Sequence, residues 1–132
     1  MPRILVIEDE ADIAETMVML LETEGYSASY AANGQAALER LARGELPNLI
    51  LLDLTMPVMN GAAFRRHQLA DPRIARIPVI LLTATPSVYD REELKPHATL
   101  TKPVGVTELL DTIERVAPLR ARSASHDGRH GT

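Results

Sequence analysis

Acidic side chains follow two apolar segments of this chain. Four consecutive aliphatic residues, 49–52, run directly into Asp53, and the aliphatic residues 4–7 run directly into Glu8 and Asp9. Carboxylates that lie close together repel one another and raise each other's pKa values unless they share a cation. Mg²⁺ is such a cation, because it prefers oxygen ligands and binds through one or two carboxylates together with phosphate and water. The two acidic ends therefore predict a magnesium site if the fold brings them together.

A threonine and a lysine end two further segments of the chain. Thr83 follows the apolar residues 79–82, and Lys102 follows the short segment 98–101. The lysine would supply a compact positive charge for a phosphoryl oxygen, and the threonine would supply a hydroxyl donor. Together with the acids, these residue types predict a site that handles phosphate with the help of a divalent cation.

The segments that carry these residues alternate with helical patterns. A continuous apolar run with no polar residue at alternate positions is typical of a strand buried on both faces of a parallel sheet. The predicted strands are 4–7, 26–31, 49–53, 77–82 and 98–101, and the predicted helices are 11–24, 36–41, 62–69, 87–94 and 107–117. This alternation predicts an α/β fold, a doubly wound five-stranded parallel sheet with right-handed crossovers and helices on both faces. Ligands of such sheets bind at the carboxyl ends of the strands, where the acids, the threonine and the lysine stand.

Length and composition limit the other possibilities. The 132 residues suffice for one domain, expected over 1–118, with a polar stretch at 119–132 that we expect to be a disordered tail or a truncated linker. The net charge of -4 gives no basic surplus, so direct nucleic-acid binding is not expected. The chain has no cysteine, which excludes disulfides and thiolate chemistry. It shows neither a signal peptide nor an apolar span long enough for a membrane, so we expect a cytoplasmic domain that does not bind membranes.

In order along the chain, the motifs resemble those of one family. They are Glu8-Asp9 after the first strand, Asp53-Leu54-Thr55-Met56-Pro57 with Gly61 after the third, Ile77-Pro78-Val79-Ile80-Leu81-Leu82-Thr83-Ala84 on the fourth, and Lys102-Pro103 after the fifth. This set is similar to that of the receiver domains of two-component response regulators, over roughly residues 3–117. The resemblance implies the flavodoxin-like (βα)5 arrangement with strand order 2-1-3-4-5.

The resemblance also implies a function and a role for each site residue. The domain would take a phosphoryl group from a phosphohistidine on a sensor histidine kinase or a histidine phosphotransfer protein. It would then switch its binding to a downstream protein partner or output domain, as in a phosphorelay. It would assist its own phosphorylation and autodephosphorylation without a separate substrate. The implied residues are the phosphoacceptor Asp53, the Mg²⁺ ligands Glu8, Asp9, Asp53 and the backbone carbonyl of Thr55, and the phosphoryl-binding Lys102, Thr83 and backbone N–H of Ala84, with a cis bond before Pro103.

Three features depart from the family's pattern. Thr99 stands where Phe or Tyr is frequent, so the family's aromatic switch is not expected in its usual form. The segment from Thr83 to Lys102 is shorter than usual, and residues 95–98 replace a Gly-Ala turn. Val104 stands where Phe is common. We therefore expect the fourth helix to be short or displaced.

Simpler interpretations exist for most of these residues. Asp53 alone could cap a turn, the acids at 8–10 could form the first turn of a helix, and Thr83 could be an ordinary strand-end hydroxyl. Their joint occurrence on one edge favours the functional interpretation, except for Glu10, which we assign to the helix turn. We expect all four histidines and the paired arginines to be solvated surface residues. They are His67, His97, His126, His130, Arg65 and Arg66.

Two other classes of protein also place an acid or a ligand after a buried strand. A Mg²⁺-dependent phosphatase with an aspartyl nucleophile is the main alternative, because Asp-Leu-Thr after a strand partly resembles the haloacid dehalogenase family. That family has a second Asp two residues after the nucleophile, where this chain has Thr55. A flavodoxin-like nucleotide binder is disfavoured because no Gly-rich loop follows the first strand.

Overall fold

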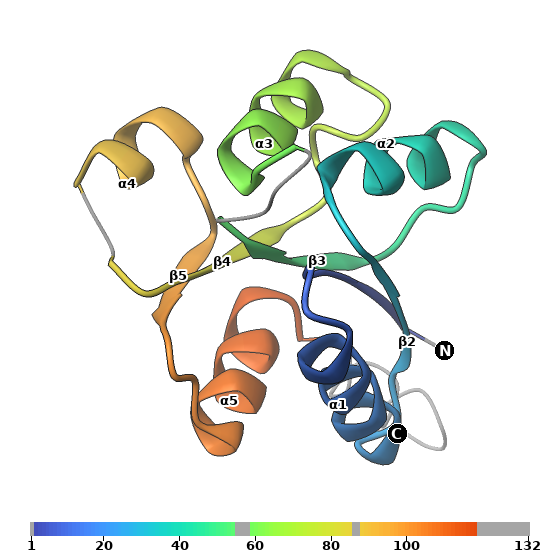
Figure 1. Cartoon of the computed structure of the whole chain (residues 1–132), viewed down its shortest axis with the longest axis vertical. Coiled ribbons are helices and arrows are strands. Elements are labelled where there is room, and N and C mark those ends of the chain that lie inside the picture. The colour runs from blue at the N-terminus through green and yellow to red at the C-terminus, as the bar shows by residue number, and fades with distance from the viewer. Residues whose placement is uncertain (1, 55–58, 86–87, 119–132) are drawn as a thin grey trace.

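The domain is built around one parallel sheet with helices on both faces (Figure 1). A computed structural model describes residues 2–54, 59–85 and 88–118. The strands are β1 (Arg3–Ile7), β2 (Ser27–Ala31), β3 (Leu49–Asp53), β4 (Val79–Thr83) and β5 (Ala98–Thr101). The helices are α1 (Ala11–Thr23), α2 (Gly34–Ala42), α3 (Gly61–Ala70), α4 (Val88–Leu94) and α5 (Val106–Val116).

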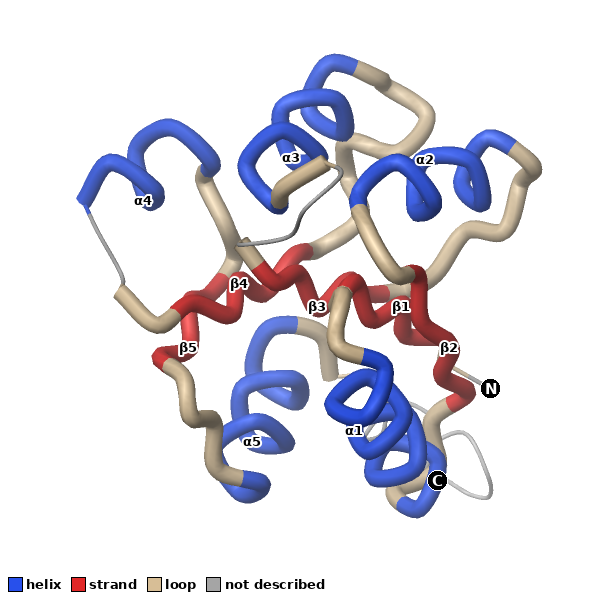
Figure 2. The backbone as a smooth tube through the Cα atoms, in the orientation of Figure 1, coloured by secondary structure: helices blue, strands red, loops and turns tan. Residues whose placement is uncertain are grey.

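The strands lie in the order β2-β1-β3-β4-β5, and every neighbouring pair is parallel. The helices α2, α3 and α4 cover one face of the sheet and α1 and α5 cover the other, as the tube view makes plain (Figure 2). The predicted fold class and strand order are therefore confirmed. Among the described ranges, no helix is long and apolar enough to cross a membrane.

The aliphatic runs fill two cores, one on each face of the sheet. Alternate residues of β3 face opposite ways, so Leu49 and Leu51 pack toward α1 and α5 while Ile50 and Leu52 pack toward α2 and α3. All four side chains are fully buried. Burial on both faces explains why this strand needs an unbroken apolar run, and it makes β3 a fixed support for Asp53.

The helix boundaries differ slightly from the predicted ones, and two differences have a clear cause. The prediction placed Asn33-Gly34 and Asn60-Gly61 in turns before their helices, whereas α2 and α3 begin at these glycines. The Asn33 side chain accepts a hydrogen bond from the Ala36 N–H at 2.8 Å, so Asn33 caps α2. Asn60 caps α3 in the same way. The fourth helix is short, as expected, with seven residues.

Candidate functional site

The register of the sheet places the strand ends side by side. Ile7 is paired with Leu52, and Leu52 with Leu81. The next residues, Glu8 and Asp53, therefore lie side by side at the ends of neighbouring strands. Thr83 is paired with Thr101, the last residue of β5. The acidic ends of β1 and β3 and the polar ends of β4 and β5 therefore meet at one edge of the sheet.

Three carboxylates gather at this edge. Oxygen atoms of Glu8, Asp9 and Asp53 all lie within 4.8 Å of one another. Glu8 and Asp53 are each 2% exposed, whereas Asp9 is exposed to solvent. One oxygen of Glu8, Oε2, accepts a hydrogen bond from the Glu10 N–H at 3.2 Å. The other, Oε1, is buried and accepts no hydrogen bond from the described residues, so it is available for a cation.

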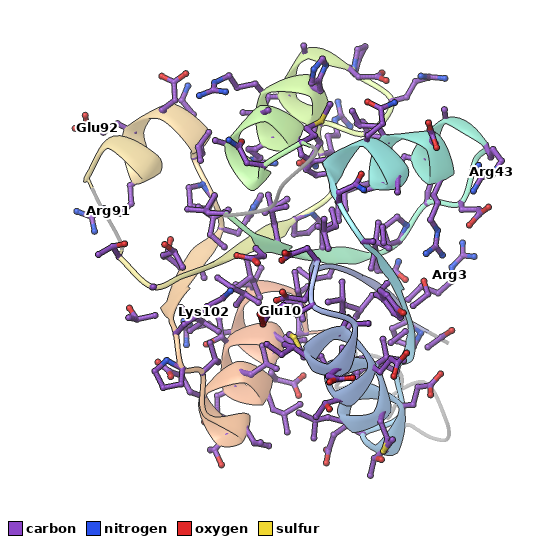
Figure 3. The ribbon with its side chains drawn as sticks, in the orientation of Figure 1. Arg3, Glu10, Arg43, Arg91, Glu92 and Lys102 are labelled. Carbon is purple, nitrogen blue, oxygen red and sulfur yellow. The ribbon has the colours of Figure 1, made fainter. Side chains whose placement is uncertain are left out.

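Lys102 extends from the end of β5 into this acidic edge. Its Nζ lies 3.0 Å from Asp53 Oδ1 and 3.9 Å from Glu8 Oε1. Its own N–H donates to the Thr83 carbonyl at 2.8 Å, which continues the β4–β5 ladder by one residue. The Lys102–Pro103 peptide bond is cis, as the resemblance implied. Figure 3 shows Lys102 and Glu10 on the side of the sheet that α1 and α5 cover.

The hydroxyl predicted at the end of β4 also lies at this edge. Thr83 is buried, at 7% exposure, and its Oγ1 accepts a hydrogen bond from the Thr85 N–H at 3.2 Å. Ala84 and Thr85, the two residues that follow, are exposed. Thr55, whose carbonyl was assigned to the metal, lies outside the described residues.

The buried position of Glu8 changes its acidity. Burial is the main cause that raises the pKa of Glu8 to about 7, and the Asp53 charge and a hydrogen bond with Asp9 act in the same direction. The Glu10 N–H and the Lys102 ammonium oppose this rise. A divalent cation beside the Glu8 carboxylate would favour its charged form and so oppose this rise in pKa.

An apolar hollow of about 500 Å³ opens beside the charged edge, between α1 and α5. Val104 and Pro103 line it next to Lys102, and Met17 and Leu20 line it from α1. Val104 stands where Phe is common in the family that the motifs resemble, and its smaller side chain lines this space. Lys102 is consequently reachable from this side as well as from the open edge.

Gly61 packs closely against the backbone at the end of β3. Its N–H donates to the Leu54 carbonyl at 2.9 Å, which joins the first residue of α3 to the residue that follows β3. A Cβ at this position would overlap the Asp53 carbonyl oxygen and lie 2.7 Å from Leu54 Cα. The absence of a side chain therefore lets α3 begin directly against the backbone of the acidic strand end.

We expect Gly61→Ala to lower the free energy of unfolding by about 2 kcal/mol, because backbone atoms cannot yield as flexible side chains do. Gly105→Ala is the matched control, since a Cβ there meets nothing within 4 Å and the backbone φ is an ordinary -74°. Urea unfolding of both variants measures the difference. Equal stability of the two variants would show that the close contact at Gly61 is easily relieved.

The sequence interpretation missed a second support of this loop. The Gly34 N–H donates to the Met59 carbonyl at 3.1 Å, and a Cβ on Gly34 would lie 2.9 Å from that same oxygen. The first turn of α2 thus packs against the loop that leads from Asp53 to α3. A glycine immediately after the capping Asn33 was the available signal, but it is equally typical of a turn.

Comparisons with known proteins agree with this geometry. Residues 4–114 match the family profile described as "Response regulator receiver domain". The chain is 34% identical over 119 residues to protein PilH of Pseudomonas aeruginosa, covering 88% of this chain and 98% of PilH. It is 36% identical over 119 residues to the alkaline phosphatase synthesis transcriptional regulatory protein SphR of Synechococcus elongatus, covering 82% of this chain and 46% of SphR. The chain thus spans about half the length of SphR and of several other curated relatives.

Solved structures show the same similarity. The chemotaxis protein CheY4 of Vibrio cholerae superposes with a TM-score of 0.81 at 28% identity, covering 88% of this chain and 98% of that one. The signal receiver domain of a signal transduction histidine kinase from Syntrophus aciditrophicus gives 0.82 at 30% identity, covering 98% and 96%. The family match, these neighbours and the strand-end acids all agree, and the chain belongs to the family of response regulator receiver domains.

Proposed function

We propose that this receiver domain takes a phosphoryl group onto Asp53 from a phosphohistidine, in a Mg²⁺-dependent reaction of two-component signalling. The observation that carries the proposal is the buried Asp53 carboxylate, with Lys102 at 3.0 Å and two further carboxylates beside it. Receiver domains are in general phosphoacceptor switches rather than enzymes with a separate substrate. The same arrangement on this chain supports that role.

In the proposed reaction, an Asp53 carboxylate oxygen attacks phosphorus, a P–O bond forms and the P–N bond to the donor imidazole breaks. The Lys102 ammonium would exchange its ion pair with Asp53 for an ion pair with an oxygen of the transferred phosphoryl group, because the negative charge shifts to that oxygen. The Thr83 hydroxyl and the Ala84 N–H would donate hydrogen bonds to the other oxygens. Positioning and charge neutralisation of this kind carry most of the catalysis in phosphoryl transfer.

The residues present fit a magnesium ion. Glu8 Oε1 is buried without a described hydrogen-bond donor, and Asp9 and Asp53 add carboxylate oxygens within 4.8 Å. We assign Glu8, Asp9, Asp53 and the Thr55 carbonyl as the groups that would hold it. When bound, Mg²⁺ would neutralise charge on the phosphoryl oxygens. Autodephosphorylation by water at the same site is part of the proposal.

The proposed partners are a sensor histidine kinase or a histidine phosphotransfer protein as donor, and a downstream protein or output domain as receiver of the signal. SphR and the other relatives that this chain half covers are named transcriptional regulators, whereas PilH is covered almost completely. Both a free-standing receiver and the receiver part of a longer regulator are compatible with these lengths.

The test is incubation with Mg²⁺ and a small phosphodonor such as acetyl phosphate, followed by intact mass measurement. We expect a gain of one phosphoryl group that requires Mg²⁺ and is absent in Asp53→Asn, because a neutral amide replaces the nucleophilic carboxylate. Asp71→Asn is the control, since Asp71 is exposed in part and pairs with Arg73 instead. No gain in the wild-type chain, or an equal gain in Asp53→Asn, would refute the proposal.

The phosphatase alternative is not favoured. The family match and the structural neighbours are receiver domains, and Thr55 stands where that alternative requires a second Asp. A generic phosphomonoester assay decides the matter directly. Turnover that Asp53→Asn abolishes would support the alternative, whereas phosphorylation of Asp53 without turnover supports the receiver reaction.

A further inference from the structure

Arg65 is a buried arginine on α3, contrary to the expectation that residues 65 and 66 are both solvated. It is 2% exposed, and burial lowers the pKa of its guanidinium. Arg66, the next residue, is exposed and forms an ion pair with Glu93 at 3.6 Å. Arginine is rarely buried completely unless its donors are satisfied. The prediction was therefore wrong for Arg65. The groups that accept its hydrogen bonds indicate its structural role.

The guanidinium donates to the end of α4. Nε donates to the Leu94 carbonyl at 2.8 Å and Nη2 to the Lys95 carbonyl at 2.9 Å. Carbonyls at the end of a helix have no partner within the helix and carry partial negative charge, so they suit a cation. Arg65 thus satisfies two backbone carbonyls at the end of this short helix.

Gln68 completes the arrangement one turn farther along α3. Its Oε1 accepts from Arg65 Nη1 at 2.7 Å, and its Nε2 donates to the carbonyls of Ile74 and Ile77, at 2.9 and 3.0 Å. Gln68 is fully buried. We call Arg65 and Gln68 the polar anchor. It joins α3 to the end of α4 and to the segment that precedes β4.

Lys95, whose carbonyl Arg65 binds, has a backbone conformation that is uncommon for its residue type. Its backbone φ is +48°, in the left-handed region that favours glycine, and its N–H donates to the Arg91 carbonyl at 3.1 Å. A lysine stays in this region only where surrounding contacts hold it there. Arg65 holds the Lys95 carbonyl, and the next connection, from the His97 N–H to the Val79 carbonyl at 2.9 Å, leads into β5.

The other end of α3 reaches the acidic edge. Gly61 begins the helix against the backbone of Asp53 and Leu54, and Arg65 follows four residues later, about 6 Å along the helix axis. On the far side of the anchor, β5 runs from Ala98 back to Lys102 and its ion pair with Asp53. A continuous series of contacts therefore leads from Asp53 through α3 and the polar anchor to β5, and returns to Asp53 through Lys102. Figure 1 shows α3 and α4 as neighbours on one face of the sheet.

We propose that the Arg65–Gln68 anchor fixes the C-terminal end of α4 and couples it, through α3, to the state of Asp53. Modification of Asp53 would then change the backbone around residues 94–98 by way of α3. Thr99 in β5 cannot act as the aromatic switch that is frequent in the family. A connection through α3 would link Asp53 to the end of α4 without such a side chain. The role of Arg65 and Gln68 in fixing the end of α4 does not depend on phosphorylation, whereas the coupling rests on the proposed phosphorylation of Asp53.

Amide hydrogen exchange of the whole unmodified chain tests the anchor. Arg65→Met keeps an unbranched side chain of similar length without donors, and Arg66→Met is the matched control on the same helix. We expect exchange of the Lys95 and His97 amides to quicken at least tenfold in Arg65→Met and to stay unchanged in Arg66→Met. The Ile50 amide, bonded to the Pro78 carbonyl at 2.9 Å, reports any global loss of stability.

Addition of Mg²⁺ and beryllium trifluoride, an analogue of the phosphoryl group, tests the coupling by nuclear magnetic resonance. In the wild-type chain we expect chemical-shift changes at Asp9 and Leu54 and also at Lys95 and His97. In Arg65→Met the changes at the acidic edge should persist, while those at Lys95 and His97 fall by at least half.

The outcomes separate the two proposals. Unchanged exchange at Lys95 and His97 in Arg65→Met overturns the anchor, and unchanged analogue-induced shifts there overturn the coupling. Failure of the wild-type chain to bind the analogue overturns the proposed function and the coupling, but leaves the exchange result to decide the anchor. If Arg65→Met does not fold, Arg65→Lys serves instead, because one ammonium cannot bind both carbonyls with the fork of a guanidinium.

Discussion

Replacement of Lys102 by methionine is expected to slow phosphorylation of Asp53 by roughly 100-fold or more, the usual loss when one preorganised charge is removed from a transition state. Lys102 Nζ lies 3.0 Å from Asp53 Oδ1, so it is already placed where negative charge would shift during transfer. Methionine keeps most of the length and the apolar stem of lysine. The measurement is the rate of mass gain with acetyl phosphate at saturating Mg²⁺.

The chain supplies its own control for this experiment. Lys95 is the only other lysine in the sequence and is exposed, with its backbone committed to the end of α4. Asp53 should be phosphorylated at the wild-type rate in Lys95→Met. This variant changes the net charge by the same amount as Lys102→Met, but far from the acidic edge. A Lys102→Met rate within fivefold of the wild-type rate would mean that the ion pair is structural and takes no part in the transfer.

The second large effect concerns pH and the metal-free protein. The pKa of Glu8 is raised from 4.5 to about 7, mainly by burial. Between these values the folded protein holds a proton that the unfolded chain has released, so stability must fall as the pH rises through this window. The expected loss is on the order of 3 kcal/mol between pH 4.5 and pH 7, with little further change from Glu8 above it.

Other groups titrate in the same range, so the difference from Glu8→Gln isolates this contribution. Urea unfolding in the presence of a chelator, at several pH values from 5 to 8, should show wild-type stability falling relative to Glu8→Gln. Excess Mg²⁺ should reduce that fall, because the metal binds the deprotonated carboxylate in the native state only. Parallel profiles for the two proteins would show that Glu8 has an ordinary pKa.

The architecture of the site was predictable from the sequence, because it depends on strands whose burial dictates their composition. An unbroken aliphatic run such as 49–52 has few stable locations other than the interior of a parallel sheet, and a parallel sheet brings its strand ends to one edge. The meeting of Glu8, Asp9 and Asp53 follows from that geometry. The roles of these three residues in phosphoryl transfer came from the resemblance and stay predictions.

The polar anchor was not predictable in the same way. Arg65 and Gln68 are polar side chains in a helix, and such residues are normally solvated. They are buried because carbonyl groups at the end of α4 and in the segment before β4 accept their hydrogen bonds, and no local pattern records where those carbonyls will lie. The Asn60-Gly61 start of α3 was missed for a smaller reason, since a turn and a capped helix begin with the same two residues.

The pairing of Thr83 with Thr101 sets limits on how this chain tolerates insertions and deletions. Side chains alternate between the two faces of a strand, so a slip of β5 by one residue would turn Lys102 away from Asp53 and bring Thr101 into its place. Length changes in the connection before β5 are therefore compatible with the site only if they are absorbed before Ala98. Natural variation in that connection should alter α4 and the 95–97 segment while the interval from Ala98 to Lys102 stays constant.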